Sequence, residues 1–298
     1  MESSAPQTIQ FFQPRHPFLV GLDSDGCVFD SMETKHKRCF IPNTIEHWRL
    51  QPIAPQARAA AEFVSLYSKW RGINRFPALL KTFELLRDWP EAVRTRTPLP
   101  DVTPLEAWVH SGTALANPAL EAECARSGDP VLKQALEWSQ AINRAVTGLL
   151  EELLPFPWVR ECAEKLVRQA DVICVSVAPT EELQREWQRH DIARYASLIA
   201  GQEMGGKKDH LKAVSAGKYA AHSVLMVGDT PGDLAAAQAN GALFFPIDPG
   251  QEKQSWERFY HEGIGRFFDH TFAGDYQASL LEEFEKLLPE TPPWKNRG

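Results

Sequence analysis

The alternation of apolar runs with helical segments after Pro155 constrains the fold more than any other feature of this sequence. Each of these helical segments is about ten residues long and is followed by a short apolar run. The runs cover residues 172–177, 197–200, 224–228 and 242–247. Strands that alternate with helices of this length predict a parallel sheet with helices on both faces. A further apolar run at 18–22 predicts a buried strand that joins the same sheet from the N-terminal region.

The long segment between these two parts has a different pattern. From residue 33 to 154 strand signals are nearly absent, and apolar residues recur at helical spacing, most clearly over 131–153. A cluster of prolines over 94–104 predicts an irregular connection inside this block. We therefore expect an α/β fold. A Rossmann-like parallel sheet core, residues 1–32 and 155–298, is interrupted after its first strand by an all-helical domain, residues 33–154.

Polar side chains stand where the predicted strands end. They are Asp23 and Asp25 after the first run, Ser176 at the second, Asp229 and Asp233 after the fourth, and Lys207 with Lys208 upstream of the fourth. In open parallel sheets, ligands bind at the carboxyl ends of the strands. The sequence therefore predicts that these distant pieces of chain form one cluster.

The residue types in this cluster suit phosphoryl transfer. Carboxylates at Asp23 and Asp229 offer the oxygen ligands that Mg²⁺ prefers, and the cation would offset the repulsion between an anionic nucleophile and a phosphate. Asp23 could attack phosphorus, and Asp25 could protonate the leaving oxygen and then deprotonate the attacking water. The Ser176 hydroxyl and a lysine ammonium would bind the transferring oxygens. Backbone N–H groups in the turn after Asp23 would add an anion-binding nest.

Each motif has a plainer interpretation when it stands alone. Asp229 and Asp233 could simply mark a helix start, with Thr230 as the N-cap and Pro231 in the first turn. A single serine after a strand carries little information, and paired lysines are common on surfaces. The order of the motifs and their common position at strand ends favour the chemical interpretation.

The set of motifs closely resembles the four signature motifs of the haloacid dehalogenase superfamily. In this sequence they are DSDGCVFD over 23–30, Ser176, Lys207 and GDTPGD over 228–233. The resemblance implies that Asp23 is the nucleophile and a Mg²⁺ ligand. It implies that Asp25 is the general acid and base and offers the metal its backbone carbonyl. Asp229 would then be the remaining metal carboxylate, with Asp233 as a nearby or alternative ligand.

The same resemblance assigns the phosphate-binding groups and the insert. Ser176 and Lys207 would bind the phosphoryl group. Lys207 is preferred over Lys208 because family members often carry this lysine four residues before a buried leucine, here Leu211. The helical insert stands where the family places a cap domain, and the usual residue after the serine is replaced here by Val177.

The reaction class follows from Asp25. Members of the family that carry an aspartate at this position hydrolyse phosphate esters or act as phosphomutases. Sugar phosphomutases carry a histidine shortly after the position of Asp30, and Lys35 and His36 stand near that place with a spacing that is one residue longer. We therefore expect a phosphatase acting on a small phosphorylated metabolite, with a phosphomutase as the alternative. A non-catalytic phosphate-binding protein of the same fold is the other alternative, although a binder does not need Asp25.

Substrate specificity is expected to come from the insert. Its most polar and aromatic stretch is 69–75, where Arg71 or Arg75 could meet a second anionic group of the substrate. The alternative is that both are ordinary surface arginines at a solvated helix end. The aromatic segment 256–272 is expected to pack in a core rather than to stack on a ligand.

Charge and composition limit the partners and the compartment. A net charge of −7 argues against nucleic acid or an anionic membrane as the main partner. The N-terminus lacks a secretory pattern, and the apolar runs are too short to span a bilayer. The five cysteines are scattered without metal-ligand spacing, which indicates a reduced, cytoplasmic setting.

Overall fold

The computed structural model describes residues 9–149 and 153–296 of the chain. The chain divides into two compact units, each assembled from two segments. The core unit comprises Met1–Ser31 and Leu153–Leu287, and the helical unit comprises Met32–Glu152 and Leu288–Gly298.

A five-stranded sheet in the order β3-β2-β1-β4-β5 forms the centre of the core unit. All neighbouring strands are parallel. The strands are β1 Phe18–Leu22, β2 Ala170–Val175, β3 Leu198–Ala200, β4 Val224–Gly228 and β5 Leu243–Pro246. Nearly every strand residue is buried, as in a sheet with both faces covered. This arrangement confirms the expected α/β class with a Rossmann-like parallel sheet, because the strand order is that of a doubly wound fold.

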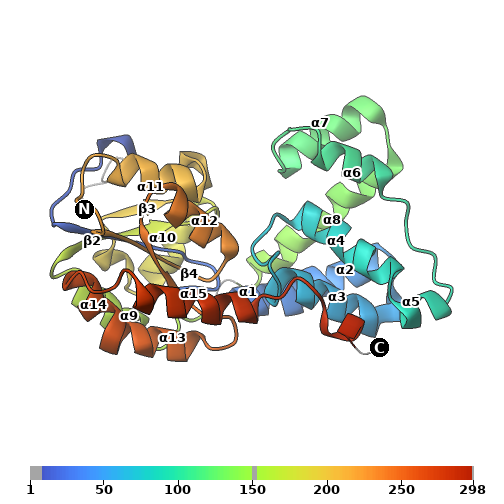
Figure 1. Ribbon diagram of the computed structural model, residues 1–298. Coiled ribbons are helices and arrows are strands. Elements are labelled where there is room, and N and C mark those ends of the chain that lie inside the picture. Colours follow the sequence, from blue (N-terminus) through green and yellow to red (C-terminus); the bar gives the residue numbers. More distant parts are fainter. Residues whose placement is uncertain (1–8, 150–152, 297–298) are drawn as a thin grey trace. The chain divides into compact units, whose positions relative to one another are not determined.

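Helices cover both faces of this sheet (Figure 1). One face packs against α9 Val159–Leu166, α10 Thr180–Arg189, α13 Glu252–Arg258 and α14 Ile264–Phe268, and the other against α11 Lys207–Ser215 and α12 Pro231–Ala239. Short helical turns lie at Ile9–Phe11, Ala193–Tyr195, Gln202–Met204 and Phe259–Gly263, and α15 Asp275–Leu287 packs near β5. This distribution follows from right-handed crossovers that leave β1 and β4 toward opposite edges of the sheet.

The aromatic segment 256–272 belongs to the core of the core unit. Trp256, Phe259, Phe267 and Phe272 are fully buried, and the Trp256 indole N–H donates to the carbonyl of Cys27 at 2.8 Å. The expectation that this segment packs rather than stacks on a ligand is confirmed. Its hydrogen bond from Trp256 to Cys27 also ties this segment to the loop that follows β1.

The described part of the helical unit is built from helices, as the sequence predicts. They are α1 Met32–Lys35, a π-helical turn His36–Phe40, α2 Ile41–His47, α3 Ala54–Leu66, α4 Arg75–Arg87, α5 Pro90–Arg94, α6 Thr103–Val109, α7 Asn117–Ser127 and α8 Pro130–Thr147, with 3₁₀ turns at Gln51–Ile53 and Pro293–Asn296. The proline-rich connection lies between α5 and α6, as expected. The helix expected over 131–153 ends at Thr147, and part of that range lies outside the described residues.

The C-terminal boundary of the core differs from the prediction. Residues 288–298 were expected in the core, but the described part of this segment, residues 288–296, joins the helical unit. Trp294 stacks on Trp89 with ring centroids 4.1 Å apart, and Lys295 pairs with Asp88 at 3.2 Å. Burial of two indole faces against each other holds this tail, a contact between residues far apart in the sequence that no local pattern reveals.

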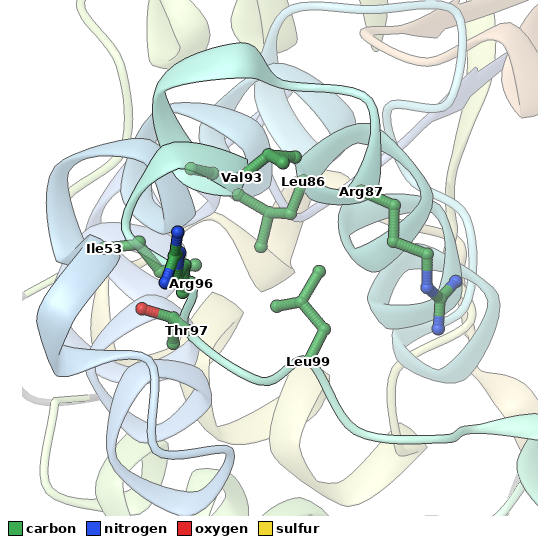
Figure 2. A pocket seen from close by; sticks show the side chains of 8 residues that line it. Ile53, Leu86, Arg87, Val93, Arg96, Thr97 and Leu99 are labelled. Atoms are coloured by element: carbon green, nitrogen blue, oxygen red, sulfur yellow. The ribbon is translucent and has the colours of Figure 1, made fainter.

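A pocket of about 290 Å³ lies inside the helical unit (Figure 2). Its wall is formed by Ile53, Leu86, Arg87, Ala92, Val93, Arg96, Thr97 and Leu99. None of the residues predicted to carry chemistry lines it.

Two sequence expectations concern the whole chain. Among the described residues, no helix has both the length and the apolar character needed to cross a bilayer. The five cysteines are buried free thiols.

Candidate active site

The site forms at the switch point of the sheet, where the chain stops adding strands toward one edge and continues toward the other. β1 and β4 are neighbours, and the chain leaves them toward opposite edges of the sheet; ligands of open α/β sheets bind outside the carboxyl ends of such a strand pair. Asp23 follows β1 and Asp229 follows β4. The Asp23 N–H donates to the carbonyl of Val227 at 3.0 Å, so the ladder between the two strands extends into the site.

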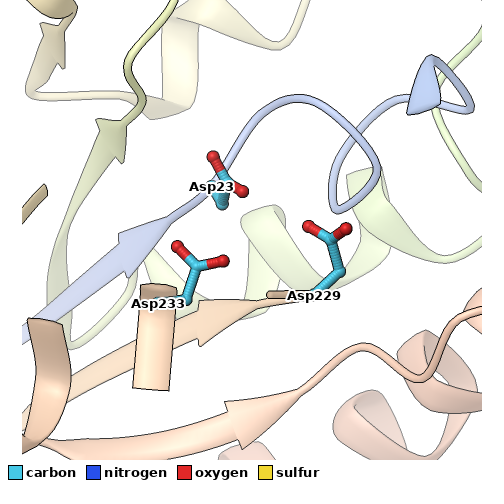
Figure 3. Close-up of side chains that lie close together, drawn as sticks. All are labelled: Asp23, Asp229 and Asp233. Atoms are coloured by element: carbon cyan, nitrogen blue, oxygen red, sulfur yellow. The ribbon is translucent and has the colours of Figure 1, made fainter. Parts of the chain in front are cut away.

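Asp23, Asp229 and Asp233 converge at this edge of the sheet (Figure 3). One carboxylate oxygen of each lies within 4.8 Å of the others, and all three side chains are buried. The expected strand ends therefore do bring these aspartates together. They come from two loops separated by about two hundred residues of chain, a convergence that parallel strand pairing produces.

Asp233 caps helix α12 and also faces the cluster. Its Oδ2 accepts from the Thr230 N–H at 3.1 Å and from the Thr230 hydroxyl at 2.6 Å, while the Asp233 N–H donates back to that hydroxyl at 3.2 Å. Together with Pro231 in the first turn, this is the capping box that starts α12. Gly228 makes the arrangement possible, because a Cβ at that position would lie 2.4 Å from the Asp233 carboxyl carbon.

Lys207, the first residue of α11, completes the cluster. Its Nζ lies 2.7 Å from Asp23 Oδ2 and 2.8 Å from Asp233 Oδ1. Lys208 is exposed. The structure thus places Lys207, and not Lys208, beside the carboxylates, as the spacing to buried Leu211 suggests.

The electrostatics of the cluster are those of buried, crowded charges. Burial raises the pKa of Asp23 well above its ordinary value, Asp233 raises it further, Lys207 opposes the shift and Asp229 adds to it. Burial alone would lower the pKa of Lys207, but the carboxylates of Asp23 and Asp233 raise it on balance. The lysine is therefore an ammonium under all ordinary conditions, and Asp23 needs neighbouring cations to remain a carboxylate.

The donor set fits a divalent cation. Three buried carboxylates against one ammonium leave two negative charges in excess when all are ionised. Excess buried charge of this kind is costly unless a cation balances it. Carboxylate oxygens are hard ligands of the type that Mg²⁺ binds. Asp23, Asp229 and Asp233 could hold such an ion.

Asp25 is held by a serine that the sequence analysis did not single out. The Ser31 hydroxyl donates to Asp25 Oδ1 at 2.5 Å and accepts from the Gly26 N–H at 3.1 Å. Asp25 itself is partly exposed at the surface of the loop. Ser31 therefore orients Asp25, the proposed general acid and base. In the sequence, the one sign of this role is that a serine follows shortly after the DSDG motif.

The expected anion-binding nest after Asp23 is wrong for most of the N–H groups of this turn. The Ser24 N–H donates to Asp23 Oδ1 at 2.8 Å, and the Val28 and Phe29 N–H groups donate to the Ser24 carbonyl at 3.0 Å. The Gly26 N–H is bound to Phe29 and Ser31. These N–H groups hydrogen-bond within the loop and hold it together, so the structure does not present them as the expected nest.

Ser176 lies just beyond β2, which is the neighbour of β1. Its N–H donates to the carbonyl of Ala200, and its buried hydroxyl oxygen accepts from the Ala178 N–H at 3.2 Å. The register pairs Leu22 with Cys174, so Asp23 and Ser176 stand at the same edge of adjacent strands. Its phosphate-binding role stays a prediction.

The two arginines of the insert are not the solvent-exposed side chains that one interpretation expected. Arg71 is 2% exposed and donates from Nη1 to the carbonyl of Leu66 at 2.9 Å. Arg75 donates from Nη1 to Asn143 at 2.7 Å and to Ser139 at 3.0 Å, and burial lowers its pKa to about 10. Both are therefore built into the helical unit, and their contact with a substrate stays a prediction.

Comparisons with known proteins give likenesses of fold at low identity. No family model and no curated protein matches the chain. Among solved structures, a haloacid dehalogenase-like family hydrolase from Streptococcus pneumoniae is 14% identical with a TM-score of 0.45, and the match covers 85% of this chain and 98% of that one. A predicted phosphoglycolate phosphatase from Haemophilus somnus is 15% identical with a TM-score of 0.38, covering 78% and 86%.

A third solved structure, a haloacid dehalogenase superfamily hydrolase of subfamily IA from Geobacter sulfurreducens, is 14% identical with a TM-score of 0.37, covering 81% and 90%. Two of these three structures, those from Streptococcus pneumoniae and Geobacter sulfurreducens, carry the family name that the sequence motifs suggest. At these identities and TM-scores they support no argument about function, which rests on the side chains described above.

Proposed function

We propose that this chain is a Mg²⁺-dependent phosphatase of the haloacid dehalogenase type, which hydrolyses a small phosphate monoester through an aspartyl-phosphate on Asp23. The observation that carries the proposal is the convergence of Asp23, Asp229, Asp233 and Lys207 at the carboxyl ends of β1 and β4. Each of these side chains matches a signature motif. Asp25, held by Ser31, supplies the group that a mere binding protein would not need.

The side chains divide the reaction into two balanced displacements. In the first, an Asp23 carboxylate oxygen forms a bond to phosphorus while the bond to the leaving alkoxide oxygen breaks, and Asp25 gives that oxygen a proton. In the second, Asp25 takes a proton from water, whose oxygen bonds to phosphorus while the bond to Asp23 breaks. Inorganic phosphate leaves, and both aspartates return to their starting state.

Lys207 and Ser176 would hold the transferring group. Lys207 already contacts Asp23 at 2.7 Å, so an oxygen on the phosphorus that Asp23 attacks falls within reach of the same ammonium. Asp233 keeps the lysine in place from its other side. When bound to the carboxylates, Mg²⁺ supplies positive charge that offsets the repulsion between Asp23 and phosphate.

We infer that the substrate is a small phosphorylated metabolite and that the helical unit acts as a cap, with Arg71 and Arg75 as candidates for a second anionic group. Five buried free thiols support a reducing, cytoplasmic setting. Neither nucleic acid nor membrane is proposed as a partner.

The test is Mg²⁺-dependent hydrolysis of an aryl phosphate, followed by a panel of metabolite phosphates. Asp23→Asn serves as the inactive control, because an amide of nearly equal size is a poor nucleophile. A phosphomutase would instead return an isomeric sugar phosphate without releasing inorganic phosphate. Binding of phosphate without turnover in the wild type would show a non-catalytic protein.

A further inference from the structure

The two loops that carry Ser176 and Lys207 are tied to each other. The Gln202 N–H donates to the carbonyl of Ala178 at 2.9 Å. One residue further along one loop and two along the other, Glu203 Oε2 accepts from the Thr180 N–H at 3.0 Å and from the Thr180 hydroxyl at 2.6 Å. We call this last pair of hydrogen bonds the Glu203–Thr180 clamp. It joins the start of α10 to the short turn that precedes α11.

The clamp supplies the hydrogen-bond acceptor that α10 lacks at its N-terminus. Pro179 stands at the N-cap position and offers no side-chain acceptor, so the Thr180 N–H would otherwise lack a partner. A carboxylate near a helix N-terminus is also favoured by the helix dipole. The hydrogen bonds from Thr180 lower the pKa of Glu203 to about 2, so this carboxylate stays charged at any pH at which the protein would be assayed.

The spacing between the two loops is set by Gly201. A Cβ at this position would lie 2.5 Å from the Thr180 hydroxyl, 2.6 Å from the Thr180 nitrogen and 2.7 Å from the carbonyl oxygen of Ala178. Two of these atoms belong to the backbone, so any larger residue would push the loops apart. The close approach is therefore built into the backbone, and Glu203 fixes it with charge-assisted hydrogen bonds.

We propose that Glu203 is a positioning residue for phosphoryl binding, because the clamp sets the place of Ser176 relative to Lys207. Ser176 lies four residues before Thr180, and its hydroxyl is bound to the intervening Ala178 N–H. Lys207 lies four residues after Glu203 and begins α11. The two groups that would hold the phosphoryl oxygens thus stand on loops that the clamp and the Gln202–Ala178 hydrogen bond join. This inference rests on the function proposed above.

The test compares Glu203→Gln with Glu182→Gln. Glutamine keeps the size of Glu203 and removes its charge, and Glu182 is an exposed acid in the first turn of the same helix. We expect Glu203→Gln to raise KM for an aryl phosphate and the inhibition constant of inorganic phosphate together, each about tenfold. A merely structural role would lower kcat through loss of folded enzyme and leave KM unchanged. Glu182→Gln should match the wild type.

Two further variants locate the effect. Gly201→Ala should reproduce the change in KM by forcing the loops apart. Thr180→Val combined with Glu203→Gln should lose less than the sum of the two single losses, because each change weakens the same contact. Additive losses would overturn the clamp as the cause.

Amide hydrogen exchange and phosphate calorimetry separate this inference from the proposed function. The Thr180 N–H should exchange faster in Glu203→Gln than in Glu182→Gln, whether or not the enzyme turns over. Wild-type turnover with unchanged KM in Glu203→Gln would overturn the positioning role and leave the proposed function intact. If the wild type binds phosphate without turnover, the function fails, and tenfold weaker phosphate binding in Glu203→Gln would still support the clamp. If the wild type neither binds phosphate nor turns over a phosphate ester, both proposals are wrong.

Discussion

Replacing Lys207 by methionine keeps the length and apolar stem of the side chain and removes its charge. In the wild type this ammonium lies 2.7 Å from Asp23 and 2.8 Å from Asp233, and its side chain is only 13% exposed. Removing one partner of a buried ion pair costs about 3–5 kcal/mol, since the remaining charge stays buried without compensation. Two carboxylates lose a partner here, so we expect a loss in this range from the free energy of unfolding at neutral pH.

The loss should depend on pH and on Mg²⁺ with a defined sign. The pKa of Asp23 is raised in the folded protein, so its ionised form costs stability, and the folded state gains stability as the pH falls through that raised pKa. The pKa of Lys207 is also raised, so its contribution is fully present below its unfolded value and is absent from the variant at every pH. The difference between wild type and variant should therefore shrink at mildly acidic pH, about 5, and shrink on adding Mg²⁺ at neutral pH.

Urea unfolding of the purified proteins in chelator, with and without excess Mg²⁺, measures these free energies. Lys208→Met is the matched control, because Lys208 is exposed on the next position of the same helix, and it should lie within about 0.5 kcal/mol of the wild type. A loss of less than about 1 kcal/mol in Lys207→Met, or a loss that is the same at both pH values, would refute the electrostatic reasoning.

The remaining predictions concern single groups in the two units. Asp23→Asn should lower turnover by about 10⁴-fold or more without lowering the melting temperature, because the ionised Asp23 carboxylate costs stability where it is buried; aryl phosphate hydrolysis and circular dichroism measure the two. Chelation should abolish activity, and Asp229→Ala should raise the Mg²⁺ concentration for half-maximal rate by at least about tenfold in a metal titration. Ser31→Ala should lower kcat about tenfold with little change in KM, because the variant loses the donor that orients Asp25. Arg71→Ala should lower the free energy of unfolding by about 2 kcal/mol, because it removes the donor to the buried Leu66 carbonyl, and wild-type stability in urea would contradict this.

The sheet and the position of the site could be predicted because both follow from local patterns. Apolar runs in alternation with helices define parallel strands, and parallel strands end at one edge. Asp23 and Asp229 could therefore be placed at the same edge of the sheet, and the pairing of β1 with β4 makes them neighbours. The choice of Lys207 over Lys208 came from the family resemblance, in which this lysine often stands four residues before a buried leucine, here Leu211.

Other features depend on contacts between loops, and no local pattern encodes them. Ser31 orients Asp25 because the turn after β1 folds back on itself, and Glu203 reaches Thr180 because Gly201 lets two loops approach. The same limit explains the interior position of Arg71, whose sequence neighbours are polar and suggested a solvated helix end. Tertiary packing, and not the local pattern, decides whether such a side chain lies inside or outside.

Asp233 shows why the plain and the chemical interpretation of a motif need not exclude each other. One of its carboxylate oxygens caps α12 through Thr230, and the other contacts Lys207 in the site. The cap fixes the rotamer of the side chain, so the second oxygen is held toward the cluster before any ligand arrives. A capping box that looks like ordinary helix-start chemistry is thus the device that preorganises a charged site. For the same reason, finding a structural role for a polar residue at a strand end is no evidence against a role in the chemistry.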